Sequence, residues 1–127
     1  MGELNEVSKV VRLTLIRIGI KCDLIGFSYL SVAIEMAVEE PMLVYNLNKL
    51  FEKVAKVCNA KSAFRVEANI QNAISFTYNQ KGFNSVNDLF GMEVFKSGHK
   101  PTTAEIIKLV SEYYLMGLYK RNGCGLF

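Results

Sequence analysis

Histidine and cysteine are scarce in this sequence of 127 residues, and their scarcity narrows the range of functions. His99 is the single histidine, and no catalytic acidic pair, nucleophile elbow or glycine-rich phosphate loop accompanies it. Cys22, Cys58 and Cys124 are odd in number, widely spaced and free of any CxxC pair, which argues against a disulfide framework or a zinc site. We therefore expect no enzyme: no catalytic residue, no metal and no cofactor.

Long uncharged apolar runs are also missing, although 50% of the residues are hydrophobic. No run approaches the roughly 18 residues of a membrane-spanning helix, and no charged-then-apolar leader with a cleavage site opens the chain. The length fits one domain over residues 1–127, which would bury about two-thirds of its unfolded surface. We expect a soluble, cytoplasmic domain without membrane association.

Positive charge is unevenly distributed along the chain. The net charge is only +3, but residues 42–83 carry six basic and two acidic side chains, whereas residues 1–41 carry four and six. Local positive charge of this kind is the expected electrostatic footprint of phosphate contact. An ordinary solvated lysine surface explains it equally well.

Apolar residues recur at helical spacing through most of the chain and predict an all-α domain of six helices. Asn5 is a good N-cap for the first helix and Gly19 a good stop. The second follows Gly26 and closes before Pro41, because a proline pushes the preceding residue out of the helical region.

The other predicted boundaries come from capping patterns and breaks. The third helix starts near Leu43 or Val44, and a weak capping pattern after Ser85 opens a short fifth helix. Thr102 and Glu105 form a capping box for the sixth, which carries apolar residues as far as Leu118. Residues 92–95 are apolar enough for a strand, but without a second strand candidate we expect an extended connector.

The third and fourth helices, over about residues 44–80, predict a helix-turn-helix joined by the polar break Asn59-Ala60-Lys61. Apolar residues from Leu47 to Val57 would face inward in the third helix. Its lysines Lys49, Lys53 and Lys56 share another face, which suits either a helix lying across a phosphate backbone or a plain solvent face.

The fourth helix, residues 62–80 with Ser62 as N-cap, has a distinct outward face. Its predicted buried stripe is Val66, Ile70, Ala73, Ile74 and Thr77. The opposite face presents Phe64, Arg65, Ala68, Gln71, Asn72, Ser75 and Asn79. Asparagine and glutamine can pair with adenine in the major groove, and alanine and phenylalanine can contact a thymine methyl group. The same residues are also common on ordinary helix surfaces.

Several motifs occur together in a fixed order. They are Ile18-Gly19-Ile20 with Ile25-Gly26; Tyr29-Leu30 with Ala33-Ile34, Val38 and Glu40-Pro41; Arg65-Val66-Glu67 with Ile70 and Ala73-Ile74; Asn87 with Leu89-Phe90-Gly91; and Lys100-Pro101-Thr102 with Glu105. Through these motifs nearly the whole chain resembles the C-terminal DNA-binding effector domain of the stage-zero sporulation protein A family, response regulators that initiate endospore formation.

The resemblance implies a six-helix fold whose fourth helix reads the major groove of double-stranded DNA. It also implies head-to-tail pairs of copies on tandem sites upstream of promoters, and contact with RNA polymerase. The expected base-reading residues are Arg65, Glu67, Ala68, Gln71 and Asn72. The expected phosphate contacts are Lys49, Lys53, Lys56, Lys61, Ser62, Lys100 and Thr102.

The sequence departs from the family pattern in three ways. Family members carry arginines where this chain has Ala68 and Gln71, and each lost bidentate contact to guanine is worth roughly 1–3 kcal/mol of discrimination. The turn before Arg65 looks one residue longer, and the phosphoacceptor domain is missing, so with Met1 at its start we expect a stand-alone domain.

Two functions follow from this mixture of matches and departures. The first is a sequence-specific DNA-binding transcriptional regulator with an altered site preference. The alternative is a protein-interaction module or decoy of the same fold, which modulates a related regulator or RNA polymerase without binding DNA. The exposed Phe64 and the neutral outward face motivate the alternative.

Overall fold

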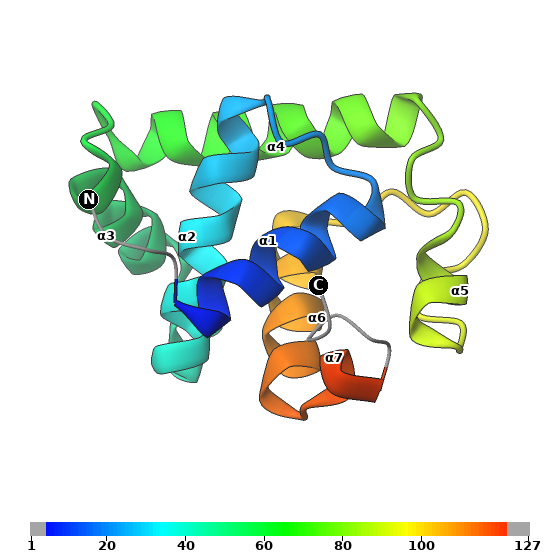
Figure 1. Ribbon diagram of the computed structural model, residues 1–127. Coiled ribbons are helices and arrows are strands. Elements are labelled where there is room, and N and C mark those ends of the chain that lie inside the picture. Colours follow the sequence, from blue (N-terminus) through cyan, green and yellow to red (C-terminus); the bar gives the residue numbers. More distant parts are fainter. Residues whose placement is uncertain (1–4, 122–127) are drawn as a thin grey trace.

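The computed structural model describes residues 5–121, which form seven α-helices, one 3-10 helix and no β-strand (Figure 1). The all-α class predicted from the sequence is therefore confirmed. The elements are α1 (Glu6–Ile18), α2 (Ile25–Glu39), the 3-10 helix η1 (Pro41–Tyr45), α3 (Leu47–Cys58), α4 (Ala63–Asn79), α5 (Val86–Phe90), α6 (Thr103–Leu115) and α7 (Leu118–Arg121).

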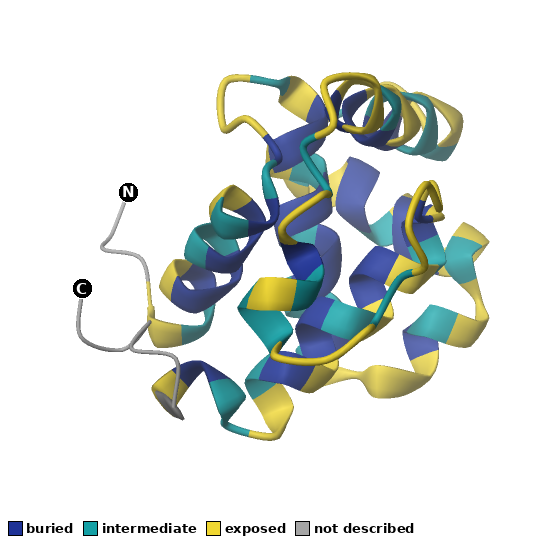
Figure 2. Cartoon of the chain, turned by 90° about the vertical axis from the view of Figure 1, so that its right-hand side faces the viewer, coloured by how far each residue is buried: buried dark blue, intermediate teal, exposed yellow. Residues whose placement is uncertain are grey.

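Helix α2 lies at the centre of the molecule and packs against α1, α3, α4 and α6. Its buried side chains include Phe27, Leu30 and Ile34, so it contributes apolar surface to several neighbours at once. Figure 2 shows the buried segments turned toward this shared interior and the exposed segments turned outward. One core thus supports the helices that surround α2.

Helix α4 lies along one edge of the molecule, at the top of Figure 1. All five residues of its predicted stripe are buried, which confirms the assignment of its inner side. Thr77 can be buried because its hydroxyl donates to the Ala73 carbonyl at 2.8 Å, so its polar atom is satisfied. Most residues on the opposite side are exposed.

Glycines let other backbone segments approach α4 closely. Gly26, at the start of α2, lies directly against the backbone of Asn69. Gly19 is left-handed (φ 116°) and faces the backbone of Gly82, just beyond the end of α4. A side chain at Gly26 would collide with α4 itself, and one at Gly19 would collide with the segment that follows α4, so both glycines help to fix the position of this helix.

The start of α3 differs from the prediction. Residues Pro41–Tyr45 form a separate 3-10 helix. Asn46, whose backbone is not helical (φ −142°, ψ 74°), separates this helix from α3. The Asn46 side chain accepts a hydrogen bond from the Lys49 N–H at 3.3 Å, which makes it the N-cap of α3. The prediction that Val57 faces inward is also wrong: it is 66% exposed, at the largely exposed last turn of α3.

The C-terminal part adds a short seventh helix to the six predicted. The sixth helix ends at Leu115, because Gly117 is left-handed (φ 72°) and turns the chain, so Leu118 begins α7 instead of continuing α6. Tyr119 is 5% exposed and its hydroxyl donates to Glu6 at 3.0 Å. Cys124 lies outside the described residues.

The sequence also led to expectations for the cap of α5, for the connector that follows it and for membrane-spanning helices. Ser85 precedes α5 as expected but makes no side-chain capping hydrogen bond, so the weak capping pattern is not realised. The connector over residues 92–95 contains no strand, as predicted. Within residues 5–121 none of the helices has the length and apolar character that crossing a membrane requires.

Candidate nucleic-acid interface

A tight turn between α3 and α4 fixes where α4 begins. Asn59 takes the left-handed conformation (φ 56°), and the Ala60 N–H donates to the Ala55 carbonyl at 2.8 Å, which satisfies the end of α3. The Ser62 hydroxyl accepts a hydrogen bond of 3.1 Å from the Arg65 N–H. Ser62 is therefore the N-cap of α4, as predicted.

We use the term reading face for the five residues of α4 that the sequence assigns to base contact: Arg65, Glu67, Ala68, Gln71 and Asn72. Arg65, Gln71 and Asn72 are exposed, whereas Glu67 and Ala68 are half-buried. None of them belongs to the buried stripe that attaches α4 to the core. The face is therefore available to a ligand without rearrangement of the core.

Two residues of the reading face are joined by a hydrogen bond. The Gln71 side-chain amide donates to the Glu67 carboxylate at 3.4 Å, one turn away. This contact uses one amide hydrogen and leaves the second hydrogen and the amide oxygen free. One donor and one acceptor are the groups that a bidentate contact to adenine requires.

A hollow of about 270 Å³ lies between the reading face and the start of α6. It brings Gln71 together with Lys100 and Thr102, two of the predicted phosphate contacts. Its remaining lining residues are Ile74, Ser75, Pro101 and Thr103. The sequence suggested both kinds of residue, but gave no reason to place them side by side.

Thr103 was missed by the sequence analysis. Thr103 is only 7% exposed, and its hydroxyl oxygen has no hydrogen-bond partner within the described structure. A buried hydroxyl without a partner is uncommon in a folded protein. Thr103 is the first residue of α6 and lines the hollow, but its hydroxyl oxygen is buried and not open to an anion from solvent.

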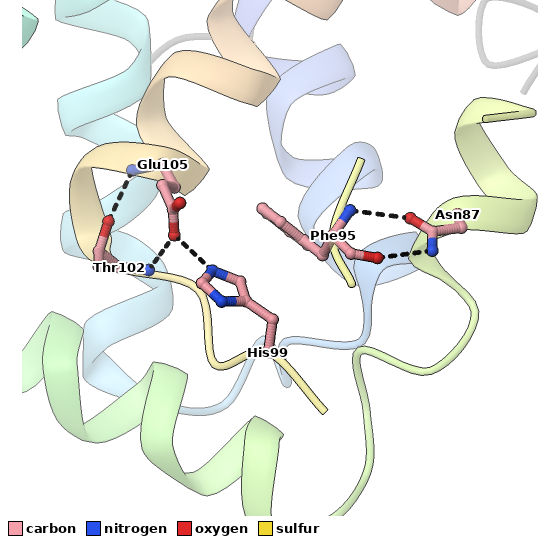
Figure 3. A network of polar contacts seen from close by, with 5 residues as sticks. All are labelled: Asn87, Phe95, His99, Thr102 and Glu105. Atoms are coloured by element: carbon pink, nitrogen blue, oxygen red, sulfur yellow. Dashed lines mark hydrogen bonds and ion pairs between the residues drawn. The ribbon is translucent and has the colours of Figure 1, made fainter. Parts of the chain in front are cut away.

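The start of α6 is held by a complete capping box, drawn in Figure 3. The Thr102 N–H donates to the Glu105 carboxylate at 2.9 Å, and the Glu105 N–H donates to the Thr102 hydroxyl at 3.1 Å. The His99 ring nitrogen Nε2 lies 2.9 Å from the same carboxylate oxygen. The backbone hydrogen bond from Thr102, followed by the contact with His99, lowers the pKa of Glu105.

The loop that precedes α6 is anchored at two more points. Asn87 in α5 donates to the Phe95 carbonyl at 2.8 Å and accepts from the Phe95 N–H at 3.1 Å (Figure 3). It also accepts from the Val94 N–H at 2.8 Å. The Tyr78 hydroxyl near the end of α4 donates to the Gly98 carbonyl at 2.9 Å. These contacts tie the loop carrying Lys100 to both α5 and α4.

The remaining predicted phosphate contacts differ in their surroundings. Lys49, Lys56 and Lys61 are exposed. Lys53 is half-buried, and its ammonium nitrogen lies 3.7 Å from the Glu40 carboxylate. A partly exposed pair of this kind contributes little to stability, but it offsets the charge that Lys53 offers to an anion.

The described residues contain no cluster of side chains suited to binding a metal ion. No group of three histidine, cysteine, aspartate or glutamate residues there could hold a metal ion. His99, the single histidine, is engaged with Glu105 at the start of α6.

Comparison with known protein families identifies the fold. Residues 11–114 match the family described as Sporulation initiation factor Spo0A C terminal. The match covers α1 to α6, apart from the first five residues of α1 and the last residue of α6. It includes α3, α4 and the turn between them, and the family implies a helix-turn-helix within this fold. Members of this family are DNA-binding transcriptional effector domains and not enzymes, and this chain belongs to the Spo0A C-terminal domain family.

Proposed function

We propose that this domain binds specific double-stranded DNA sites through α4 in the major groove, and that its site preference differs from that usual in the family. The observation that carries the proposal is the hollow between α4 and α6, where Gln71 and the Lys100–Thr102 segment lie together. A helix that reads bases needs neighbouring groups that bind phosphates, because phosphate contacts set its register on the duplex.

Within the reading face we assign the base contacts by chemistry. Arg65, in the first turn of α4, suits guanine, which offers two acceptors in the major groove. Gln71 and Asn72 suit adenine, and Glu67 either accepts from cytosine or orients Gln71 through their 3.4 Å hydrogen bond. Ala68 offers only a methyl group.

Phosphate contacts are assigned to both sides of α4. Ser62 accepts from the Arg65 N–H, which leaves its own hydroxyl hydrogen free to donate to a phosphate. Lys49, Lys56 and Lys61 supply exposed charge, and Lys53 contributes least because of Glu40.

On the opposite side of α4, Lys100 and Thr102 bind a phosphate at the N-terminus of α6. The capping box and the anchored loop hold these groups in place before DNA arrives. A site organised in advance loses less conformational entropy on binding.

The altered preference follows from the two uncharged positions Ala68 and Gln71 of the reading face. Family members carry arginine where this chain has Ala68 and Gln71, and arginine is the commonest specific reader of guanine. Replacing two such readers by a methyl group and an amide shifts the preference from guanine toward adenine and thymine.

The larger assembly is proposed from the family resemblance. Two copies bind head to tail on tandem sites, and the domain contacts RNA polymerase from there. A DNA-bound regulator of this kind acts in the cytoplasm.

The test is a selection of bound sequences from a random double-stranded DNA pool, with wild type beside the double variant Ala68→Arg/Gln71→Arg. We expect wild type to select a site and the double variant to select one richer in guanine. Failure of the wild type to retard any fragment at low salt would refute the proposal. Identical sites for both proteins would refute only the altered preference.

The competing function, a protein-interaction module or decoy, predicts the reverse behaviour. The domain would then co-purify with a related regulator or with RNA polymerase, and would show no DNA binding even at low salt. Phe64, which is 77% exposed, is the observation that favours it.

A further inference from the structure

Phe64 is the most exposed of the large hydrophobic side chains in the described residues, at 77%. It is the second residue of α4, directly before Arg65. A single exposed apolar residue is ordinary on a protein surface. At the start of a reading helix it has a specific consequence, because N-terminal residues of such a helix contact base edges.

The helical repeat places Phe64 in line with the reading face. Residues four apart lie on the same side of a helix, about one turn apart, so Phe64 lies over Ala68, and Gln71 follows along the same line. The outward side of α4 therefore changes along its length. It begins with an apolar pair and continues with the amides of Gln71 and Asn72.

The backbone beneath Phe64 is held on both sides. The Arg65 N–H donates to the Ser62 hydroxyl at 3.1 Å, and the Val66 N–H donates to the Ser62 carbonyl at 3.2 Å. Only the two side-chain torsions of Phe64 remain to be fixed on binding. An aromatic side chain with few torsions provides contact area at a low entropic cost.

In the major groove, an apolar ring of this kind finds one matching group, the C5 methyl of thymine. The other base edges present hydrogen-bonding groups there, which a phenyl ring would desolvate without replacing their partners. Resting on the proposed DNA-binding function, we propose that Phe64, supported by Ala68, is a specificity-determining residue that recognises thymine through its methyl group.

The experiment removes the methyl group alone. Starting from the DNA site selected by the wild type, each thymine is replaced in turn by deoxyuridine, which differs only in lacking the C5 methyl. Burial of one methyl-sized group corresponds to about a fourfold change in affinity. We expect one or two positions where wild-type binding weakens by roughly this factor, and where Phe64→Ala binds both DNAs equally.

Phe76→Ala serves as the matched control. Phe76 is another exposed phenylalanine of α4, but its ring lies beside the Lys21 ammonium group at 5.7 Å and off the Phe64–Ala68 line. This variant should keep the full sensitivity to deoxyuridine. Unchanged thermal unfolding of Phe64→Ala would show that the fold is intact.

The outcomes separate this inference from the function on which it rests. Wild type that binds no DNA at low salt would overturn the proposed function itself. Salt-dependent binding without sensitivity to deoxyuridine at any position, or the same sensitivity in Phe64→Ala, would overturn only the role of Phe64.

Discussion

Gly26 in α2 and Asn69 in α4 meet so closely that a Cβ atom at Gly26 would lie 2.2 Å from the Asn69 carbonyl oxygen. No rotamer change relieves such a contact, because both partners are backbone. The spacing between α2 and α4, and with it the seating of the reading face, depends on the absence of a side chain at this position.

Gly26→Ala is expected to destabilise the protein by about 1–3 kcal/mol, the usual cost of overpacking a tight contact, and to weaken DNA binding by shifting α4. Urea unfolding followed by circular dichroism measures the first effect and gel retardation the second. Ser28→Ala, exposed in the same turn of α2, should change neither. Wild-type stability in Gly26→Ala would show that α2 and α4 can separate freely.

Asn87→Ala removes three hydrogen bonds to the loop before α6. Because the backbone groups of Val94 and Phe95 lose their partner, we expect a cost of roughly 1–3 kcal/mol in unfolding free energy. DNA affinity should fall without a change in the selected sequence, since the loop positions Lys100 and not a base-reading residue. The exposed Asn84→Ala is the control. A changed base preference in Asn87→Ala would contradict this division of roles.

The pKa of Glu105 gives a pH dependence with a definite sign. A carboxyl group whose pKa is lowered in the folded state stabilises the fold above its unfolded pKa, and this stabilisation is lost as the pH falls through the folded value. The advantage of wild type over Glu105→Gln should therefore be present at pH 7 and shrink below about pH 4, the ordinary glutamate range.

The expected size at pH 7 is on the order of 0.5 kcal/mol, typical of one capping element. Denaturant unfolding at both pH values measures it. Glu112→Gln, on an exposed glutamate of the same helix, should show a smaller and less pH-dependent effect. A constant difference between wild type and Glu105→Gln from pH 7 to pH 3 would exclude the ionised carboxylate as its source.

Lys100→Ala should reduce the slope of log affinity against log salt by about 0.9, the value for one phosphate contact on duplex DNA. Lys53→Ala should reduce it less, because Glu40 already offsets part of its charge. Lys9→Ala, in α1, is a charge-matched control expected to leave the slope unchanged. Fluorescence anisotropy over a salt series provides the measurement, and equal slopes for all three variants would contradict the assigned interface.

Local signals predicted most of the helices well. Helix caps act through neighbours within a few residues, as at Asn5, Gly19, Ser62 and the Thr102–Glu105 box. Such contacts can therefore be predicted from the local sequence. The buried stripe of α4 was likewise predicted correctly because its period is regular.

Features that depend on distant partners were missed. Val57 follows the apolar period of α3 and is nevertheless exposed. The seventh helix depends on a turn at Gly117 and on the contact between Tyr119 and Glu6. The hollow lined by Gln71 and Thr103 forms only when α4 and α6 are packed together. The spacing of apolar residues along a sequence does not reveal the distance between two helices.

The separation of exposed and buried residues on opposite sides of α4 affects how the DNA preference of such a domain can change in evolution. Arg65, Gln71 and Asn72 are exposed, and the residues that seat the helix lie on its other side. Substitutions at exposed positions usually change stability by within about 0.5 kcal/mol. Duplicated copies of the domain could therefore acquire different DNA preferences through a few substitutions, each intermediate remaining folded, with no need to evolve a new core.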